Sequence, residues 1–144
     1  MSSTVSRPPP EGGIREKLNA IAARRIIVLD GAMGSLIQSF HLAEGDFRGG
    51  RFAAHPVNLL GCNDLLCLTR PDLISRIHED YLKAGADITK TCSFNATSVS
   101  LADFGIGELA YEISRAAAAL ARGAADRFSS PERPRFVAGS MGPT

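Results

Sequence analysis

The sequence predicts an α/β fold with parallel strands, because short strand-like segments alternate with segments of helical periodicity. Residues 26–29, 87–91 and 135–140 are typical of short strands. The segments between them carry apolar residues at helical spacing, and strands joined by helical crossovers pair in parallel. Three parallel strands do not close a barrel, so we expect the chain to be the first part of a larger (β/α) domain.

The first predicted strand ends in a polar turn. Residues 26–29 are four consecutive aliphatic residues, which suits a strand buried on both faces. Asp30 marks the point where that strand reaches water, and Gly31 and Gly34 let a ligand approach the backbone. Ligands of α/β folds bind at this end of the strands. Asp30 is therefore either the cap of a tight turn or a group that holds a ligand ammonium while the Gly31 amide faces the ligand's carboxylate.

The helices are predicted from apolar spacing and from residues that begin and end helices. Thr69 is expected to cap the third helix, with Asp72 in a capping-box position, and Gly85 to end it. Residues 41–62 are expected to form a long irregular loop. The predicted helices cover residues 13–25, 35–40, 69–84, 96–104 and 108–128.

Composition excludes several classes of function. The 144 residues suffice for one domain, and a net charge of +1 leaves no electrostatic footprint for nucleic acid or an anionic membrane. No apolar run approaches the roughly 20 residues of a membrane span. Residues 1–12 are expected to be a disordered lead-in without the features of a secretory signal. These features predict a cytoplasmic protein.

Other candidate groups have simpler interpretations. Cys62, Cys67 and Cys92 do not have the spacing of a zinc site, and an odd number of cysteines fits a reducing compartment, so buried free thiols are expected. His78 is expected on a helix surface. Residues 138–142 lack the first glycine of a nucleophile elbow.

Lys90 lies where a strand should end, which leaves two interpretations open. It is a Schiff-base nucleophile of a barrel lyase, or a solvated lysine paired with Asp87 or Glu112.

The strand ends together resemble the homocysteine S-methyltransferase family, and within it the N-terminal homocysteine-binding module of cobalamin-dependent methionine synthases. The resemblance extends from about Ile14 to Thr144, and the segments 46–49 and 63–66 are similar to the cobalamin-dependent members rather than to betaine-dependent ones. The matching segments are 27–34, 46–49, 51–52, 63–66, 84–88, 94–97, 136–140 and 142–144, with Thr91 between them.

The resemblance implies a (β/α)8 barrel of the TIM type, of which residues 13–144 would be the first three βα units. It implies homocysteine as substrate, with Asp30 binding the amino group and the amides of Gly31 and Thr91 binding the carboxylate. Zinc would activate the thiol, and methylcobalamin, recharged from methyltetrahydrofolate on separate modules, would supply the methyl group. The family's zinc cysteines lie late in the barrel and are expected beyond Thr144, so this chain alone is expected to bind no cofactor and to be inactive.

Two positions depart from the family pattern. Lys90 stands where the family usually has glutamate, and Cys92 where it has asparagine. A lysine that points into the site would repel a substrate ammonium. The departures keep two alternatives open: a truncated, non-enzymatic relative, and a different barrel enzyme that uses Lys90.

Overall fold

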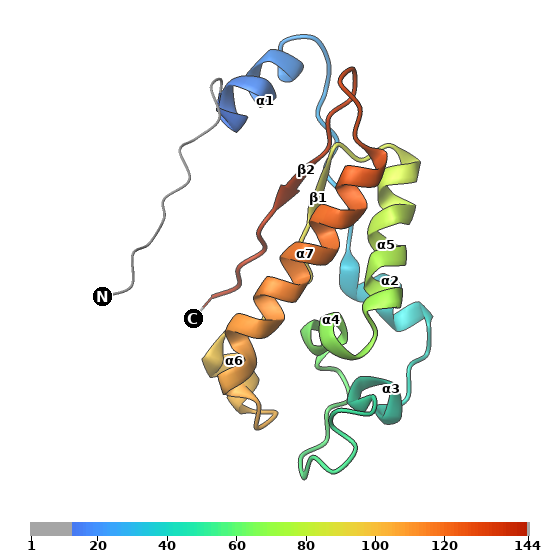
Figure 1. Cartoon of the computed structure of the whole chain (residues 1–144), viewed down its shortest axis with the longest axis vertical. Coiled ribbons are helices and arrows are strands. Elements are labelled where there is room, and N and C mark those ends of the chain that lie inside the picture. The colour runs from blue at the N-terminus through green and yellow to red at the C-terminus, as the bar shows by residue number, and fades with distance from the viewer. Residues whose placement is uncertain (1–12, 144) are drawn as a thin grey trace, which may run out of the picture.

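The sheet consists of two parallel strands, β1 (Ile88–Lys90) and β2 (Phe136–Ala138), in a computed structural model that describes residues 13–143. Ile88 pairs with Phe136 and Lys90 with Ala138. The two long helices α5 (Pro71–Ala84) and α7 (Ala110–Phe128) pack against each other and along the sheet (Figure 1). Parallel pairing across helical crossovers is thus confirmed. The lead-in expected at residues 1–12 lies outside the described residues.

The remaining helices are short. None of the residues of the N-terminal helix α1 (Ile14–Ala22) is buried. Within residues 13–143 no helix has the length and apolar character to cross a bilayer. In chain order these elements are α1 (Ile14–Ala22), α2 (Met33–Ser39), α3 (Glu44–Arg48), the 3-10 turn η1 (Asn63–Leu65), α4 (Leu66–Thr69), α6 (Ser98–Ala102) and the 3-10 turn η2 (Gly107–Leu109).

Two details of the predicted helices are wrong and one is confirmed. Thr69 is the last residue of α4 rather than a cap, and α5 begins at Pro71. Proline suits a first helical position because its φ is preset and its missing N–H would have no helical partner. Residues 41–62, expected to be irregular, contain α3. Gly85 ends α5 as predicted, with a φ of 114° that glycine adopts without strain.

The segment 26–29 is not the strand buried on both faces that its composition predicts. Only Leu29 forms a bridge, in parallel, to Ile88. Ile26 is 85 % exposed and Leu29 51 %. The reason is that α5 and α7 cover one side of the sheet, and none of the described elements packs over these side chains.

The core lies between α5, α7 and the short helices. Ile74 and Ile77 of α5 are buried with Ile113 and Ala117 of α7 in one apolar cluster. The buried face of α7 is largely alanine, which lets α5 approach closely. Ile113, Ala117 and Ala124 of α7 are fully buried.

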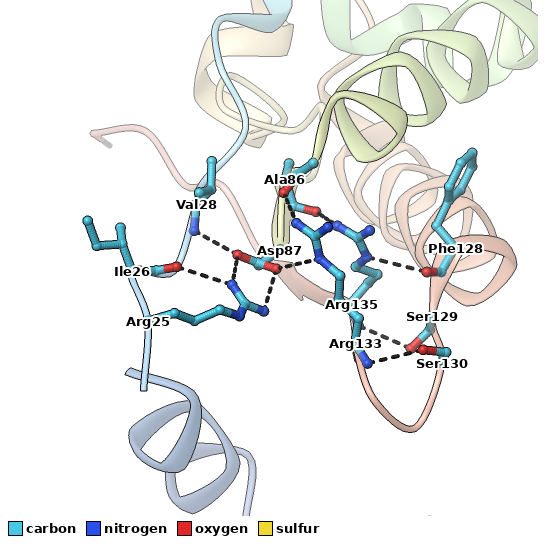
Figure 2. Close-up of polar contacts among 11 residues, drawn as sticks. Arg25, Ile26, Val28, Ala86, Asp87, Phe128, Ser129, Ser130, Arg133 and Arg135 are labelled. Atoms are coloured by element: carbon cyan, nitrogen blue, oxygen red, sulfur yellow. Dashed lines mark hydrogen bonds and ion pairs between the residues drawn. The ribbon is translucent and has the colours of Figure 1, made fainter. Parts of the chain in front are cut away.

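Asp87, just before β1, joins three segments at the N-terminal end of the sheet (Figure 2). Its carboxylate accepts hydrogen bonds from Arg25 at 2.7 and 2.9 Å and from the Val28 amide at 2.9 Å. Arg133 Nε lies 3.5 Å away, while Arg135 donates to the carbonyls of Ala86 and Phe128. Only 1 % of the Asp87 side chain is exposed, so these partners replace the water that the carboxylate loses.

The partners of Asp87 also set its protonation. Burial raises the pKa of the carboxyl group, but the hydrogen bonds from Arg25 and Val28 and the charges of Arg25 and Arg133 outweigh it. The pKa falls to about 2. The side chain is therefore a carboxylate throughout the neutral range.

His78 is fully buried, so its predicted position on the helix surface is wrong. It lies four residues from Ile74 and from Leu82, on the face of α5 that packs inward. Its Nδ1 lies 2.8 Å from Thr89 Oγ1 of β1. Burial lowers the pKa of the imidazole, although the nearby Asp30 charge opposes this, so the ring is neutral at pH 7. The i, i+4 spacing was the signal in the sequence that indicated burial.

We expect Asp87→Asn to lower the free energy of unfolding at pH 7 by about 3 kcal/mol, because it breaks a buried ion pair whose Arg25 partner is partly exposed. The folded pKa is depressed, so this stability is present above pH ~4 and is lost as the pH falls toward 2. Urea unfolding followed by circular dichroism from pH 7 to 2 should show the difference between the two proteins shrinking. Asp80→Asn, on the exposed face of α5, is the control. Equal stability of Asp87→Asn and wild type at pH 7 would contradict the role of Asp87.

His78 should make stability depend on pH in a higher range. Its folded pKa is lowered, so the unfolded chain takes up a proton that the folded chain does not, and stability falls as the pH drops below about 6.5. One such group contributes a slope of at most about 1.4 kcal/mol per pH unit. His78→Asn should remove this component, while His41→Asn, at an exposed residue with a φ of 51° that asparagine tolerates, should keep it. An unchanged slope between pH 7 and 5 in His78→Asn would refute the assignment.

Candidate functional site

A hollow of about 330 Å³ lies at the C-terminal end of the sheet. All three residues expected at the site, Asp30, Gly31 and Thr91, line it. The other lining residues come from the start of α2, from η1, from the end of β1 and from the chain after β2: 32–34, 63–64, Lys90, 92–95 and Ser140. The structure thus brings together segments more than 100 residues apart at the end of the sheet where α/β proteins bind ligands.

The two carboxylate oxygens of Asp30 differ in their hydrogen bonding. Oδ2 accepts hydrogen bonds from Thr89 Oγ1 and from the Lys90 amide, both at 2.9 Å. Oδ1 is buried and has no hydrogen-bond partner among residues 13–143. The side chain is 1 % exposed, so a negative charge sits in the hollow with half of its hydrogen-bonding capacity unused.

A short chain of side chains orients Asp30. Thr89 has one hydroxyl proton and donates it to Asp30, so its oxygen accepts from His78 Nδ1–H. This fixes the neutral imidazole with its proton on Nδ1. Sequence reasoning missed both residues, because their contact depends on how α5 lies on β1.

Gly31 has a steric reason to be glycine. A methyl group there would lie 2.8 Å from the Tyr81 hydroxyl, which donates to the Ala32 carbonyl at 3.1 Å. Tyr81 of α5 therefore supports the turn that follows Asp30. It was not singled out as a site residue, and the sequence carries no local signal for this contact.

Thr91 is held by the neighbouring strand. Its amide, which the resemblance assigns to a substrate carboxylate, donates to the Ala138 carbonyl at 3.0 Å. Its hydroxyl accepts from the Ser140 amide at 2.8 Å and lies 2.7 Å from Ser93 Oγ. Thr91 thus joins the two strand ends that form the wall of the hollow.

The cysteines are buried free thiols, as predicted. A hydrogen bond with Cys67 and burial both raise the pKa of Cys92, and burial raises the pKa of Cys62 to about 11. Asp64, whose pKa is raised by burial, lies 3.8 Å from Cys92 Sγ and accepts from the Asn95 amide. Thiols that stay protonated are neither nucleophiles nor metal ligands. Among residues 13–143 no three potential ligands gather as a metal site would need.

The sequence suggested that Lys90 pairs with Asp87 or Glu112, and this prediction is wrong. Those carboxylates bind Arg25 and Arg51. The Lys90 ammonium lies instead 3.7 Å from Asp30 Oδ1, with 39 % of its side chain exposed. A Schiff-base lysine is desolvated, so this half-exposed position does not favour that chemistry.

The chain is similar to known methyltransferases over most of its length. The model of the family described as homocysteine S-methyltransferase matches residues 27–144. Among solved structures, the metallated form of the homocysteine methyltransferase MmuM from Escherichia coli has 27 % sequence identity and a TM-score of 0.67. That match covers 88 % of this chain and 41 % of MmuM, and the oxidized form matches with the same identity and TM-score over 40 % of its length.

The chain thus spans about two fifths of the solved relatives. Residues 27–144, which the family model matches, include every residue that lines the hollow around Asp30. The sheet topology, the polar strand end and the family model agree. This chain belongs to the homocysteine S-methyltransferase family.

Proposed function

We propose that this chain carries the amino-acid-binding part of an enzyme that transfers a methyl group to the thiol of homocysteine and so produces methionine. The observation that supports this most directly is Asp30, a buried carboxylate with Oδ2 held by two donors and Oδ1 without a hydrogen-bond partner in the described part of the chain. Family membership supports the same substrate.

The hollow suits an α-amino acid in size and charge. Its volume of about 330 Å³ is at the lower end of the range for small-molecule pockets. The ammonium group would bind Asp30 Oδ1, and the carboxylate would face the Gly31 amide at the adjacent turn. Thr91, whose amide is engaged with Ala138, would contribute to the wall of the pocket.

The residues described here do not fit the zinc ion that the family implies. Cys62, Cys67 and Cys92 are buried, and among residues 13–143 they do not gather with other potential ligands as a metal site would need. We therefore assign no step of the reaction to a metal held by residues 13–143. What this part of the chain would do is orient homocysteine through its amino-acid end and leave the thiol free to react.

We further propose methylcobalamin as the methyl donor, as in methionine synthases. The support is the resemblance of residues 46–49 and 63–66 to the cobalamin-dependent members. In the structure these segments form α3, η1 and the start of α4, and Asn63 and Asp64 line the hollow. Methyl transfer to homocysteine from methylcobalamin by the whole protein tests this choice, and turnover only with another donor would refute it.

Asp30→Asn should weaken the binding of L-homocysteine at least tenfold, about 1.4 kcal/mol or more, because it removes the charge that faces the ammonium. Asparagine keeps the size of the side chain and an oxygen for Thr89. Isothermal titration calorimetry of the 144-residue chain gives the dissociation constants, with Asp80→Asn as the control for loss of an exposed carboxylate. Equal affinity of wild type and Asp30→Asn would overturn the proposed role of Asp30.

A further inference from the structure

Lys90 and Thr89 point to opposite faces of β1. Thr89 is fully buried beneath α5, where it contacts His78, whereas Lys90 is partly exposed on the open face. From there its side chain reaches Asp30, and Nζ lies 3.7 Å from Oδ1. The protein's own ammonium group therefore lies at the carboxylate oxygen to which the proposed function assigns the substrate ammonium.

Asp30 has room for one cation. Its Oδ2 is occupied by the Thr89 hydroxyl and the Lys90 amide, which leaves Oδ1. Oδ1 is buried from solvent. Two ammonium groups at the same oxygen would repel each other in a partly desolvated pocket. A ligand with an ammonium group therefore has to displace Lys90, whose flexible side chain is 39 % exposed and free to move into solvent.

A ligand without an ammonium group can bind in the same hollow without displacing Lys90. It leaves the pair between Lys90 and Asp30 intact, and its carboxylate approaches a lysine whose charge partly offsets that of Asp30. The same lysine thus disfavours one class of ligand and tolerates the other. Selectivity for an α-amino acid over its des-amino analogue depends on Lys90 as well as on Asp30.

We propose that Lys90 is a specificity-determining residue that competes with the ligand ammonium for Asp30 and lowers the preference of the pocket for α-amino acids. The proposal rests on the proposed function, because it takes the hollow around Asp30 as the homocysteine site. It adds an internal competitor to that site.

The test compares two ligands that differ only in the ammonium group, L-homocysteine and 4-mercaptobutanoate. Their dissociation constants are measured by calorimetry on the 144-residue chain, on Lys90→Gln and on Lys90→Met. Lys83→Gln, at an exposed lysine in the last turn of α5, is the matched control. Circular dichroism verifies that each variant is folded.

We expect both Lys90 variants to raise the preference for homocysteine over 4-mercaptobutanoate about fivefold, the effect of losing a partly exposed charge. Lys83→Gln should keep the wild-type ratio. Homocysteine binding that is detectable only in the Lys90 variants would support the proposal equally.

Two results would overturn the proposed role of Lys90, and they have different consequences for the proposed function. If homocysteine binds to the wild type and the ratio is unchanged in both Lys90 variants, the competitor role fails and the proposed function stands. If homocysteine binds to neither the wild type nor the Lys90 variants, both fail, because removing a competitor from a real site must reveal binding.

Discussion

The carboxylate of Asp87 is the constraint on which the arrangement of the sheet depends. It accepts hydrogen bonds from Arg25 and from the Val28 amide (Figure 2). The backbone N–H of Asp87 donates to the Val28 carbonyl at 2.7 Å, and its backbone carbonyl accepts from the Phe136 amide at 2.8 Å. Asp87 thus contacts both residues 26–29 and β2, the two segments that lie beside β1. The register carries Asp30 and Thr91 to the other end of the sheet, where both line the hollow.

Asp87 and Asp30 show how two buried aspartates in one sheet can differ in role. Every carboxylate oxygen of Asp87 has a donor or a cation beside it, so nothing is left for a ligand. Asp30 has a fully engaged Oδ2 and an Oδ1 with only the Lys90 ammonium at 3.7 Å. Burial does not distinguish the two residues, since both side chains are 1 % exposed. They differ in the number of partners that each carboxylate oxygen has.

The orientation of Asp30 depends on the packing of α5 against β1. His78 and Tyr81 both belong to α5, and they support Thr89 and the Gly31 turn respectively. A helix that buries its apolar face against the sheet therefore also positions the polar end of the site. The packing of α5 thus affects the geometry of the hollow. His78 acts on Asp30 through Thr89, and Tyr81 contacts the turn directly.

Much of this protein was determined by local sequence. The long helix before β2, the glycine that ends α5, the parallel strands and the polar turn at Asp30 follow from periodicity, from the φ that Gly85 adopts and from the change from aliphatic to polar residues after Leu29. The helix, its end and the turn depend on neighbours within a few residues, whereas the parallel pairing follows from the helical crossovers that join the strands. Asp30 and Gly31 were candidates because they follow the first predicted strand, at the end where α/β folds bind ligands. The resemblance to the family added Thr91, and all three residues line the hollow.

Which side chains contact one another depends on how distant segments pack in the folded chain. Lys90 pairs with Asp30 rather than with Asp87 or Glu112, and the Thr91 amide belongs to Ala138. His78 is buried, and residues 26–29 are not covered as their composition suggests. Each of these outcomes depends on the register of strands and the packing of helices that lie far apart in the sequence. Composition and spacing determine which chemical groups each segment carries. Which of these groups come within hydrogen-bonding or ion-pairing distance is determined by the folded chain.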